Sequence, residues 1–554
     1  MSPSVQCRDP NSTADERLAP TSRLRHAGAW TRAVFWFASA GYLIVVAWVG
    51  RFPNWDETFY KAAGRAWALR GTFAAPEIIG RLPFEPPIDK IFAAYPPLYP
   101  FAFGVWTKLF GFGWRQVALF DACIHVGLAL MTARFVVCLA PTVPSVVRYA
   151  AALLILVPCG TATIGRPDEL AMIFMLVAVC LYRERRTSLG IVGAGVAWGL
   201  CAATSVGAAA LLGLACAPVL LTQSNGTDVG SARLNAARWL KDAAVLATAA
   251  ALTFGLCWLP ILLAEPRAWH QFVDHVSGDV RPPGGYLDQV KSTLIYGKFT
   301  LFPLAGSMIA LACAWTIRTR AERRVARSTE TAAVHGSAPI RSLQLAAWSV
   351  VPVAAVFFSL VTRPWKFTYA WFCGPILIAV ACVVLASTWR AGKVRAMAIA
   401  ASGLVLVGSV TLAAVPWALE TISLVTAPPD QGWAAAERVL RDVVPDGATV
   451  LAIEHWSVLA GRCEVVYDAK FCGDDRIDHV NWIVFSGFRS GAPGRRGRMR
   501  DAWEIALQRD FVLVHDSLLR ERFKLFGHPI SNSSWGLGPM VFKREQVAVG
   551  AKRG

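Results

Sequence analysis

Long apolar segments recur through most of this chain and constrain its fold more than any other feature. A helix needs about 20 mainly apolar residues to cross a bilayer. By this measure the chain has eleven candidate spans, with 188–222 taken as two short helices that meet near Thr204-Ser205. The spans are 33–50, 116–138, 149–164, 168–182, 188–203, 206–222, 243–263, 299–317, 343–361, 371–387 and 397–416. We therefore expect an all-α polytopic membrane protein.

Composition and charge agree with this expectation and exclude other classes. The 554 residues are 55% hydrophobic and only 17% charged, whereas soluble domains are about a quarter charged. The net charge of +18 raises the question of nucleic-acid binding. The basic residues, however, fall in short clusters between apolar segments, as at 183–186 and 318–327. Such clusters are typical of cytoplasmic loops in membrane proteins, so we expect no nucleic-acid partner.

The basic loops also predict the orientation. The basic segments lie on one side of the membrane if the number of spans is odd, and that side is cytoplasmic by the positive-inside rule. They are the N-terminal tail 1–32, 183–187, 223–241, 318–342 and 389–396. The outer side then carries the loop 51–115, the turn 161–167, the loop 264–298, the turn 362–370 and everything after 416. We expect a multi-pass protein of the inner or plasma membrane with its N-terminus in the cytoplasm.

Two outer regions differ from the spans. The loop 51–115 is rich in Trp, Phe, Tyr and Pro, which predicts helices lying against the bilayer within the membrane domain 33–416. In the tail 417–554, segments 447–455 and 481–487 are typical of strands, and 434–444 and 501–511 have helical periodicity. We predict a small, soluble, extracytoplasmic α/β domain there.

The chain has 13 cysteines, and most of them lie inside apolar stretches, where Cys behaves as a small hydrophobe. No Cys/His group has zinc spacing. Cys463 and Cys472 lie in the polar tail, and a disulfide between them is a hypothesis.

The first chemical candidate is the acidic pair Asp56-Glu57, directly after the first span. A carboxylate at the membrane surface can accept a proton as a general base. Glu57 lies three residues after Asn54, which is a capping-box pattern, and Gly71 follows as a stop signal. Glu57 therefore has a helix-capping alternative, whereas Asp56 has no such duty beyond favouring the helix N-terminus.

Two further outer turns carry charge. In Gly165-Arg166-Pro167-Asp168-Glu169, the proline and the acids suit a helix start, but this does not explain charges at bilayer depth, where ionisable groups are costly. In the segment 362–369, Arg363 and Lys366 could simply reach the interface or could together hold a phosphate. Both alternatives stay open for each turn.

Other polar residues have structural explanations first. Tyr95-Pro96-Pro97-Leu98-Tyr99-Pro100 predicts a helix start near residue 100. His125, Asp121 and Asp242 are isolated among apolar residues, and we expect them to be satisfied packing or interface groups.

Together these motifs resemble the GT-C membrane glycosyltransferases, in the branch of the protein O-mannosyltransferases and bacterial aminoarabinose transferases. The resemblance covers about residues 30–420 and depends on the order of four motifs. They are the acidic pair 56–57, YPPLYPFAFGVWTKLFG at 95–111, RPDE at 166–169 and KFTYAWFCGP at 366–375.

The resemblance implies an enzyme that moves a hexosyl or pentosyl group from a polyprenyl-phosphate donor to a glycan, lipid or protein acceptor, with inversion. Asp56 would be the general base, and Asp168 would orient the sugar or the acceptor. Charge on the departing phosphate would be stabilised by Lys366. The substrate-binding or donor-binding residues would be Glu57, Tyr95, Tyr99, Arg166, Asp168, Arg363, Lys366 and Tyr369.

Some points stay open. Relatives carry a lysine near the position of Thr204-Ser205, so a phosphate contact could come from Lys298 instead. No dedicated metal site is expected, although Asp56, Glu57 and Asp168 could hold Mg or Mn. The alternatives to an enzyme are a transporter or flippase for lipid-linked sugars, against which the lack of internal repeats speaks, and a non-catalytic envelope scaffold.

Overall fold

The computed structural model describes most of the membrane domain and part of the tail. The described residues are 22–50, 57–76, 86–157, 165–184, 187–222, 232–277, 285–328, 338–362, 364–388, 393–426, 432–452, 455–466, 480–486, 511–516, 524–525, 528–529 and 539–545.

The first part of the chain is a helix bundle, and each of the eleven predicted spans overlaps a helix in it. For the span 149–164 the helix ends at Leu156, and residues 158–164 lie outside the described residues. The long helices are α2 (Ser22–Val49), α5 (Trp114–Leu139), α6 (Ser145–Leu156), α7 (Asp168–Glu184), α8 (Ser188–Thr204), α9 (Val206–Thr222), α10 (Ala232–Ala264), α13 (Lys298–Ser328), α14 (Ala338–Thr362), α15 (Gly374–Thr388) and α16 (Lys393–Thr426). The predicted break near Thr204-Ser205 is confirmed, because α8 ends at Thr204 and α9 begins at Val206.

By length and apolar composition, the described residues contain six helices that could each cross a membrane. They are 26–49, 114–139, 240–264, 300–317, 369–387 and 396–415. Shorter apolar helices at 145–156, 188–204, 206–216 and 346–362 fill the bundle between them. The all-α polytopic architecture is confirmed. The helix α16 continues to Thr426, past the expected end of the membrane domain at residue 416.

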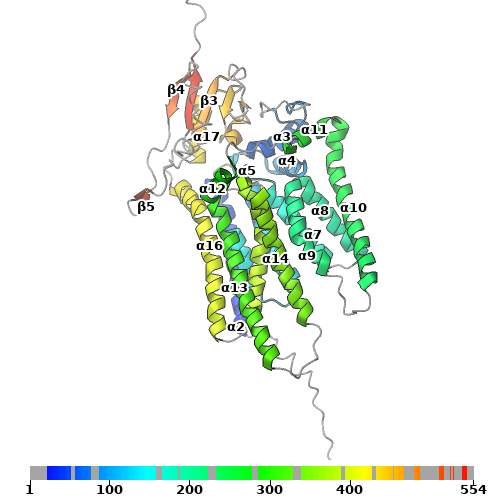
Figure 1. Ribbon diagram of the computed structural model, residues 1–554. Coiled ribbons are helices and arrows are strands. Elements are labelled where there is room, and N and C mark those ends of the chain that lie inside the picture. Colours follow the sequence, from blue (N-terminus) through cyan, green and yellow to red (C-terminus); the bar gives the residue numbers. More distant parts are fainter. Residues whose placement is uncertain are drawn as a thin grey trace, which may run out of the picture.

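Short helices and the tail gather at one end of the bundle (Figure 1), here called the domain end. They are α3 (Glu57–Arg70), α4 (Leu98–Phe110), α11 (Ala268–Ser277), α12 (Tyr286–Tyr296) and the 3-10 helix η3 (Pro364–Cys373). These elements come from the loops that the basic-residue pattern places on the outer side. Loop 51–115 contains the helices α3 and α4, as predicted, and their position against the bilayer stays a prediction.

The tail forms the predicted α/β domain. Its helices are α17 (Trp433–Val443) and α18 (Trp456–Leu459), and its strands are β1 (Thr449–Ala452), β2 (Glu464–Val466), β3 (Trp482–Ser486), β4 (Phe511–Asp516), β5 (Lys524–Leu525), β6 (His528–Pro529) and β7 (Pro539–Arg544). One sheet has the order β2-β1-β3-β7-β4. In it β1 pairs parallel with β2 and β3, while β7 pairs antiparallel with β3 and β4. The expected helix 501–511 lies outside the described residues except for Phe511, which begins β4.

The α/β domain packs directly on α3 and on the start of α5. The rings of Trp114 and Trp433 stack with centroids 5.8 Å apart, and the Trp114 indole N–H donates to Glu437 Oε2 at 3.1 Å. The Arg65 guanidinium donates to the carbonyl oxygen of Ala460. One apolar core includes residues of α3, α4 and the sheet, so the domain and the loop helices share an interior.

Candidate active site

The site is built around α3, the helix that follows the acidic pair. α3 begins at Glu57, and Gly71, with φ of +74°, stops it by donating its N–H to the Trp67 carbonyl at 3.0 Å. The predicted stop at Gly71 is confirmed, whereas the predicted cap at Asn54 lies outside the described residues. Asp56 and the side chain of Glu57 lie outside the described residues. In the sequence, Asp56 directly precedes the first residue of α3.

Aromatic rings from three segments converge on the first turn of α3. Phe59 and Tyr60 lie 4.9 and 4.6 Å from Tyr95, and Tyr95 lies 4.5 Å from the His275 ring of α11, centroid to centroid. We call Phe59, Tyr60, Tyr95 and His275 the Tyr60 cluster. It brings a predicted site residue, Tyr95, next to the helix that the acidic pair precedes.

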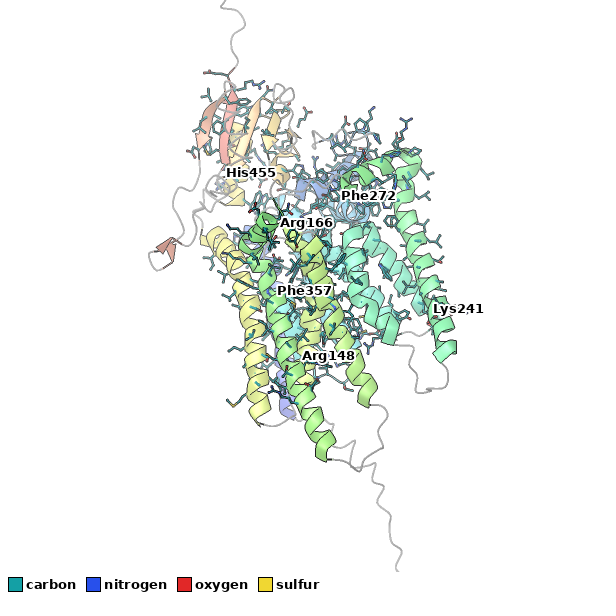
Figure 2. All side chains as sticks on the ribbon, in the orientation of Figure 1. Arg148, Arg166, Lys241, Phe272, Phe357 and His455 are labelled. Atoms are coloured by element: carbon teal, nitrogen blue, oxygen red, sulfur yellow. The ribbon has the colours of Figure 1, made fainter. Side chains whose placement is uncertain are left out.

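Arg166 joins this cluster from the turn before α7. Its guanidinium carbon lies 5.5 Å from the centre of the Tyr60 ring, and its Nε donates to Asp168 Oδ2 at 2.9 Å. The Ser205 hydroxyl, at the α8–α9 break, lies 3.5 Å from Asp168 Oδ1. Figure 2 shows Arg166 at the domain end, between Phe272 of α11 and His455 of the α/β domain. The two predicted residues of the RPDE turn thus lie beside α3.

The neighbouring acid, Glu169, has a different duty. Its Oε1 lies 3.0 Å from Nδ1 of His125, and both side chains are buried. His125 Nε2 lies 3.3 Å from the carbonyl oxygen of Leu156. Glu169 therefore ties α7 to α5 and α6, and His125 is a satisfied interior residue, as expected. Pro167 precedes α7 rather than opening it, and its carbonyl accepts the Ala171 N–H at 3.0 Å.

A buried charged network adjoins the Tyr60 cluster, because Lys61 follows Tyr60 in α3. Lys61 Nζ lies 2.6 Å from Asp121 Oδ2, with side chains 0% and 1% exposed. The Tyr99 hydroxyl donates to Asp121 Oδ1 at 3.0 Å. We call Lys61, Tyr99 and Asp121 the Lys61 network. Tyr99, a predicted donor-binding residue, is therefore hydrogen-bonded in the interior, and its ring centroid lies 6.4 Å from that of Tyr60.

Sequence reasoning missed Lys61 and His275. Asp121 lies in an apolar helix, where a carboxylate normally needs a partner of opposite charge. That need was the signal that could have pointed to Lys61. Nothing in the sequence pattern singles out His275, because its neighbours Phe59 and Tyr95 are remote along the chain.

The phosphate-binding candidates lie in or before η3. Arg363 and the side chain of Lys366 lie outside the described residues. Tyr369 is partly buried and stacks on Phe372 with centroids 5.3 Å apart. The helix η3 packs against α9 and α7, the helix whose first residue is Asp168. The backbone of this segment therefore belongs to the same end of the bundle.

Comparison with known proteins places the fold. No protein-family model matches the chain, and no curated protein matches it. The crystal structure of apo ArnT from Cupriavidus metallidurans superposes with a TM-score of 0.52 at 16% identity, over 93% of this chain and 97% of that one. The chain has the GT-C fold.

Two other GT-C structures are similar at lower scores. The apo oligosaccharyltransferase of Archaeoglobus fulgidus gives a TM-score of 0.46 at 12% identity, over 83% of this chain and 70% of that one. The mycobacterial arabinofuranosyltransferase AftD gives 0.43 at 13% identity, over 92% of this chain and 40% of that one. The fold assignment depends on the ArnT superposition, and the chemistry has to be argued from the site.

We asked whether the described residues of the candidate site could bind a divalent cation. The Archaeoglobus enzyme was crystallised in complex with Zn and sulfate. Here Asp168 is already paired with Arg166, and the side chains of Asp56 and Glu57 lie outside the described residues, so the described residues do not make an oxygen site. In the described part of the chain, Cys138, Cys180 and Glu184 could hold a metal at the other end of α5 and α7.

The hypothesised disulfide stays untested, because Cys472 lies outside the described residues. Cys463 is buried, and burial raises the pKa of its thiol. Its Sγ–H donates to the carbonyl oxygen of Pro445 at 3.7 Å.

Proposed function

We propose that this protein is an inverting glycosyltransferase that moves a hexosyl or pentosyl group from a polyprenyl-phosphate donor to an acceptor at the outer face of the membrane. The observation that carries the proposal is the convergence of Arg166, Asp168 and Tyr95 on the first turn of α3, the helix that follows Asp56 in the sequence. They come from two separate segments, the RPDE turn and the proline motif, and the sequence alone indicates each of them as a candidate.

The environment of this convergence suits a lipid-linked substrate. It lies at the end of an apolar helix bundle, where a polyprenyl chain could lie among the helices while its phosphate and sugar stay at the polar end. ArnT, whose fold this chain shares, has also been crystallised bound to undecaprenyl phosphate. A cation at the bundle end is a reasonable partner for such a phosphate.

The proposed reaction is a single displacement at the anomeric carbon. The acceptor oxygen or nitrogen attacks that carbon, a new glycosidic bond forms, and the bond to the phosphate oxygen breaks with its electron pair. The carboxylate of Asp56 takes the acceptor proton. Lys366 and Arg363 stabilise the charge left on the phosphate, and Tyr369 donates a hydrogen bond to it. Asp168, held by Arg166, orients the sugar or the acceptor.

The Asp56→Asn variant tests the central assignment. Transfer of radiolabelled sugar from a polyprenyl-phosphate donor by purified protein should fall about 10²–10⁴-fold, the usual worth of a general base. Expression and donor binding should be retained. Asp89→Asn is the matched control, because Asp89 is an exposed acid of the same loop, and it should transfer normally.

The same variant separates the rival functions. Unchanged transfer in Asp56→Asn would show that another group takes the proton. A flippase would move lipid-linked sugar across vesicles without making a glycoside. A scaffold would keep its full cellular phenotype in the variant.

A further inference from the structure

Helix α11 is locked onto the loop that carries Tyr95. The Gln271 side chain is fully buried, and its Oε1 accepts the Ala93 N–H at 2.8 Å. Its Nε2 donates to the carbonyl oxygens of Ile91, at 3.0 Å, and Pro86. One amide thus satisfies three backbone groups of the loop, an arrangement that fixes both position and register.

The lock sets the position of His275. Residues four apart lie on the same helix face, so the face that holds Gln271 against the loop also presents His275 to it. The His275 ring lies 4.5 Å from Tyr95 and 6.0 Å from Phe59. By holding α11 against the loop, Gln271 positions the His275 imidazole, which comes from the loop 264–298, near the first turn of α3.

The Tyr60 cluster has a closed side and an open side. Phe59 and Tyr60 are buried, with 6% and 3% of their surface exposed, whereas Tyr95 and His275 keep part of theirs accessible. These two rings form the accessible edge of the cluster. Their polar edges can exchange hydrogen bonds with a bound molecule.

We propose that His275, together with Tyr95, binds the sugar group of the lipid-linked donor. The inference builds on the proposed function and adds a residue to its site. A sugar presents hydroxyls that both donate and accept hydrogen bonds, which a neutral imidazole and a phenol can match in both directions. The apolar ring faces of the cluster cover the less polar face of the sugar.

The position of α11 does not depend on His275 alone. α11 is already held by the Gln271 hydrogen bonds and by the rings of Trp258 and Phe272, 5.4 Å apart. A phenylalanine at position 275 would keep the ring contacts and remove the hydrogen-bonding nitrogens. His275→Phe is therefore the informative change. His270, exposed on the same helix, provides the matched control His270→Phe.

The experiment measures binding by the full-length purified protein in nanodiscs. The probes are bare undecaprenyl phosphate and the same lipid carrying a mannosyl or an arabinosyl group. We expect the wild type to bind a glycosylated lipid more tightly than the bare one. His275→Phe should weaken binding of that lipid about tenfold, the worth of one or two hydrogen bonds, and leave bare lipid unchanged. His270→Phe should bind both as the wild type does.

Each other outcome overturns the inference. If His275→Phe binds both lipids normally, His275 does not touch the sugar. If it weakens both equally, the residue serves the phosphate or the fold. If the wild type itself fails to favour either glycosylated lipid, both sugar recognition by His275 and the proposed donor class fall. Because binding is measured, an error in the role of Asp56 alone would not alter these results.

Discussion

Two neighbouring residues of α3, Tyr60 and Lys61, belong to two ion clusters that differ in exposure. Lys61 belongs to a pair with Asp121 that is 0% and 1% exposed and also includes the Tyr99 hydroxyl. Tyr60 lies under Arg166, whose pair with Asp168 is 16% and 3% exposed. Both clusters contain a cation and a carboxylate within hydrogen-bonding distance. They differ in their access to the outside.

Access decides what each cluster can do. A fully buried pair with its hydrogen bonds satisfied cannot bind a ligand without breaking, so the Lys61 network holds α3 against α4 and α5. The Arg166 guanidinium keeps an accessible part beside the Tyr60 cluster, so it can contact a substrate. Residue type alone does not distinguish structure from function here, whereas burial does.

The largest expected effect is on stability, from Lys61→Met. The substitution leaves the Asp121 carboxylate buried without its cation, which typically costs about 3–5 kcal/mol. The thermal midpoint in detergent, followed by fluorescence-detected size exclusion, should fall strongly. The double variant Lys61→Met with Asp121→Leu should recover much of the loss, because the uncompensated charge is gone.

The control for this prediction is an exposed pair. Arg441 and Glu437 lie 3.1 Å apart on the surface of α17, with side chains 63% and 39% exposed. Arg441→Ala should change the stability by less than about 0.5 kcal/mol. If Lys61→Met lowered the thermal midpoint no more than Arg441→Ala does, the structural role of the Lys61 network would be refuted.

Next in size is the effect of Arg166→Lys, which should appear in activity. Lysine keeps the charge but loses the planar group that pairs with Asp168 and lies over Tyr60. Sugar transfer should fall about tenfold, equivalent to about 1.4 kcal/mol, with a midpoint nearer to wild type than that of Lys61→Met. If Arg166→Lys strongly lowered the thermal midpoint but kept normal activity per folded molecule, the Arg166–Asp168 pair would serve stability rather than function.

The smallest expected effect comes from the contact between the bundle and the α/β domain. Trp433→Ala removes the stack on Trp114, an aromatic pair worth about 0.5–1.5 kcal/mol beyond its buried area. Limited proteolysis should release the domain faster than in wild type. Trp30→Ala, at a 73% exposed position, is the matched control and should leave the proteolysis rate unchanged. Equal rates in both variants would show that the other contacts alone hold the domain.

The bundle was predictable because its signal is local. Each apolar run of sufficient length must satisfy its own backbone within the membrane, and a helix does so without any partner. The stop of α3 at Gly71 and the break before Val206 were also predictable, because each depends on residues close together in the chain. Strands 447–455 and 481–487 were recognised from their local pattern and form β1 and β3.

Which polar residues pair with one another could not be predicted from the local sequence. The local pattern explained Asp168 and Glu169 alike as acids of a helix start, and only the family resemblance gave Asp168 a role at the site. In the structure Asp168 contacts Arg166 and Ser205, whereas Glu169 contacts His125. Tertiary packing likewise gave Tyr95 and Tyr99, which the proline motif presents together, different partners, His275 and Asp121.

From the sequence alone came the helices, the α/β tail and the order of the motifs, because apolar length, capping residues and turn residues act within a few positions of one another. Only the tertiary structure paired Lys61 with Asp121 and brought His275 to Tyr95. Those contacts join residues far apart in the chain. They exist because the packing of helices, rather than any local preference, decides which polar side chains are buried together and which stay accessible.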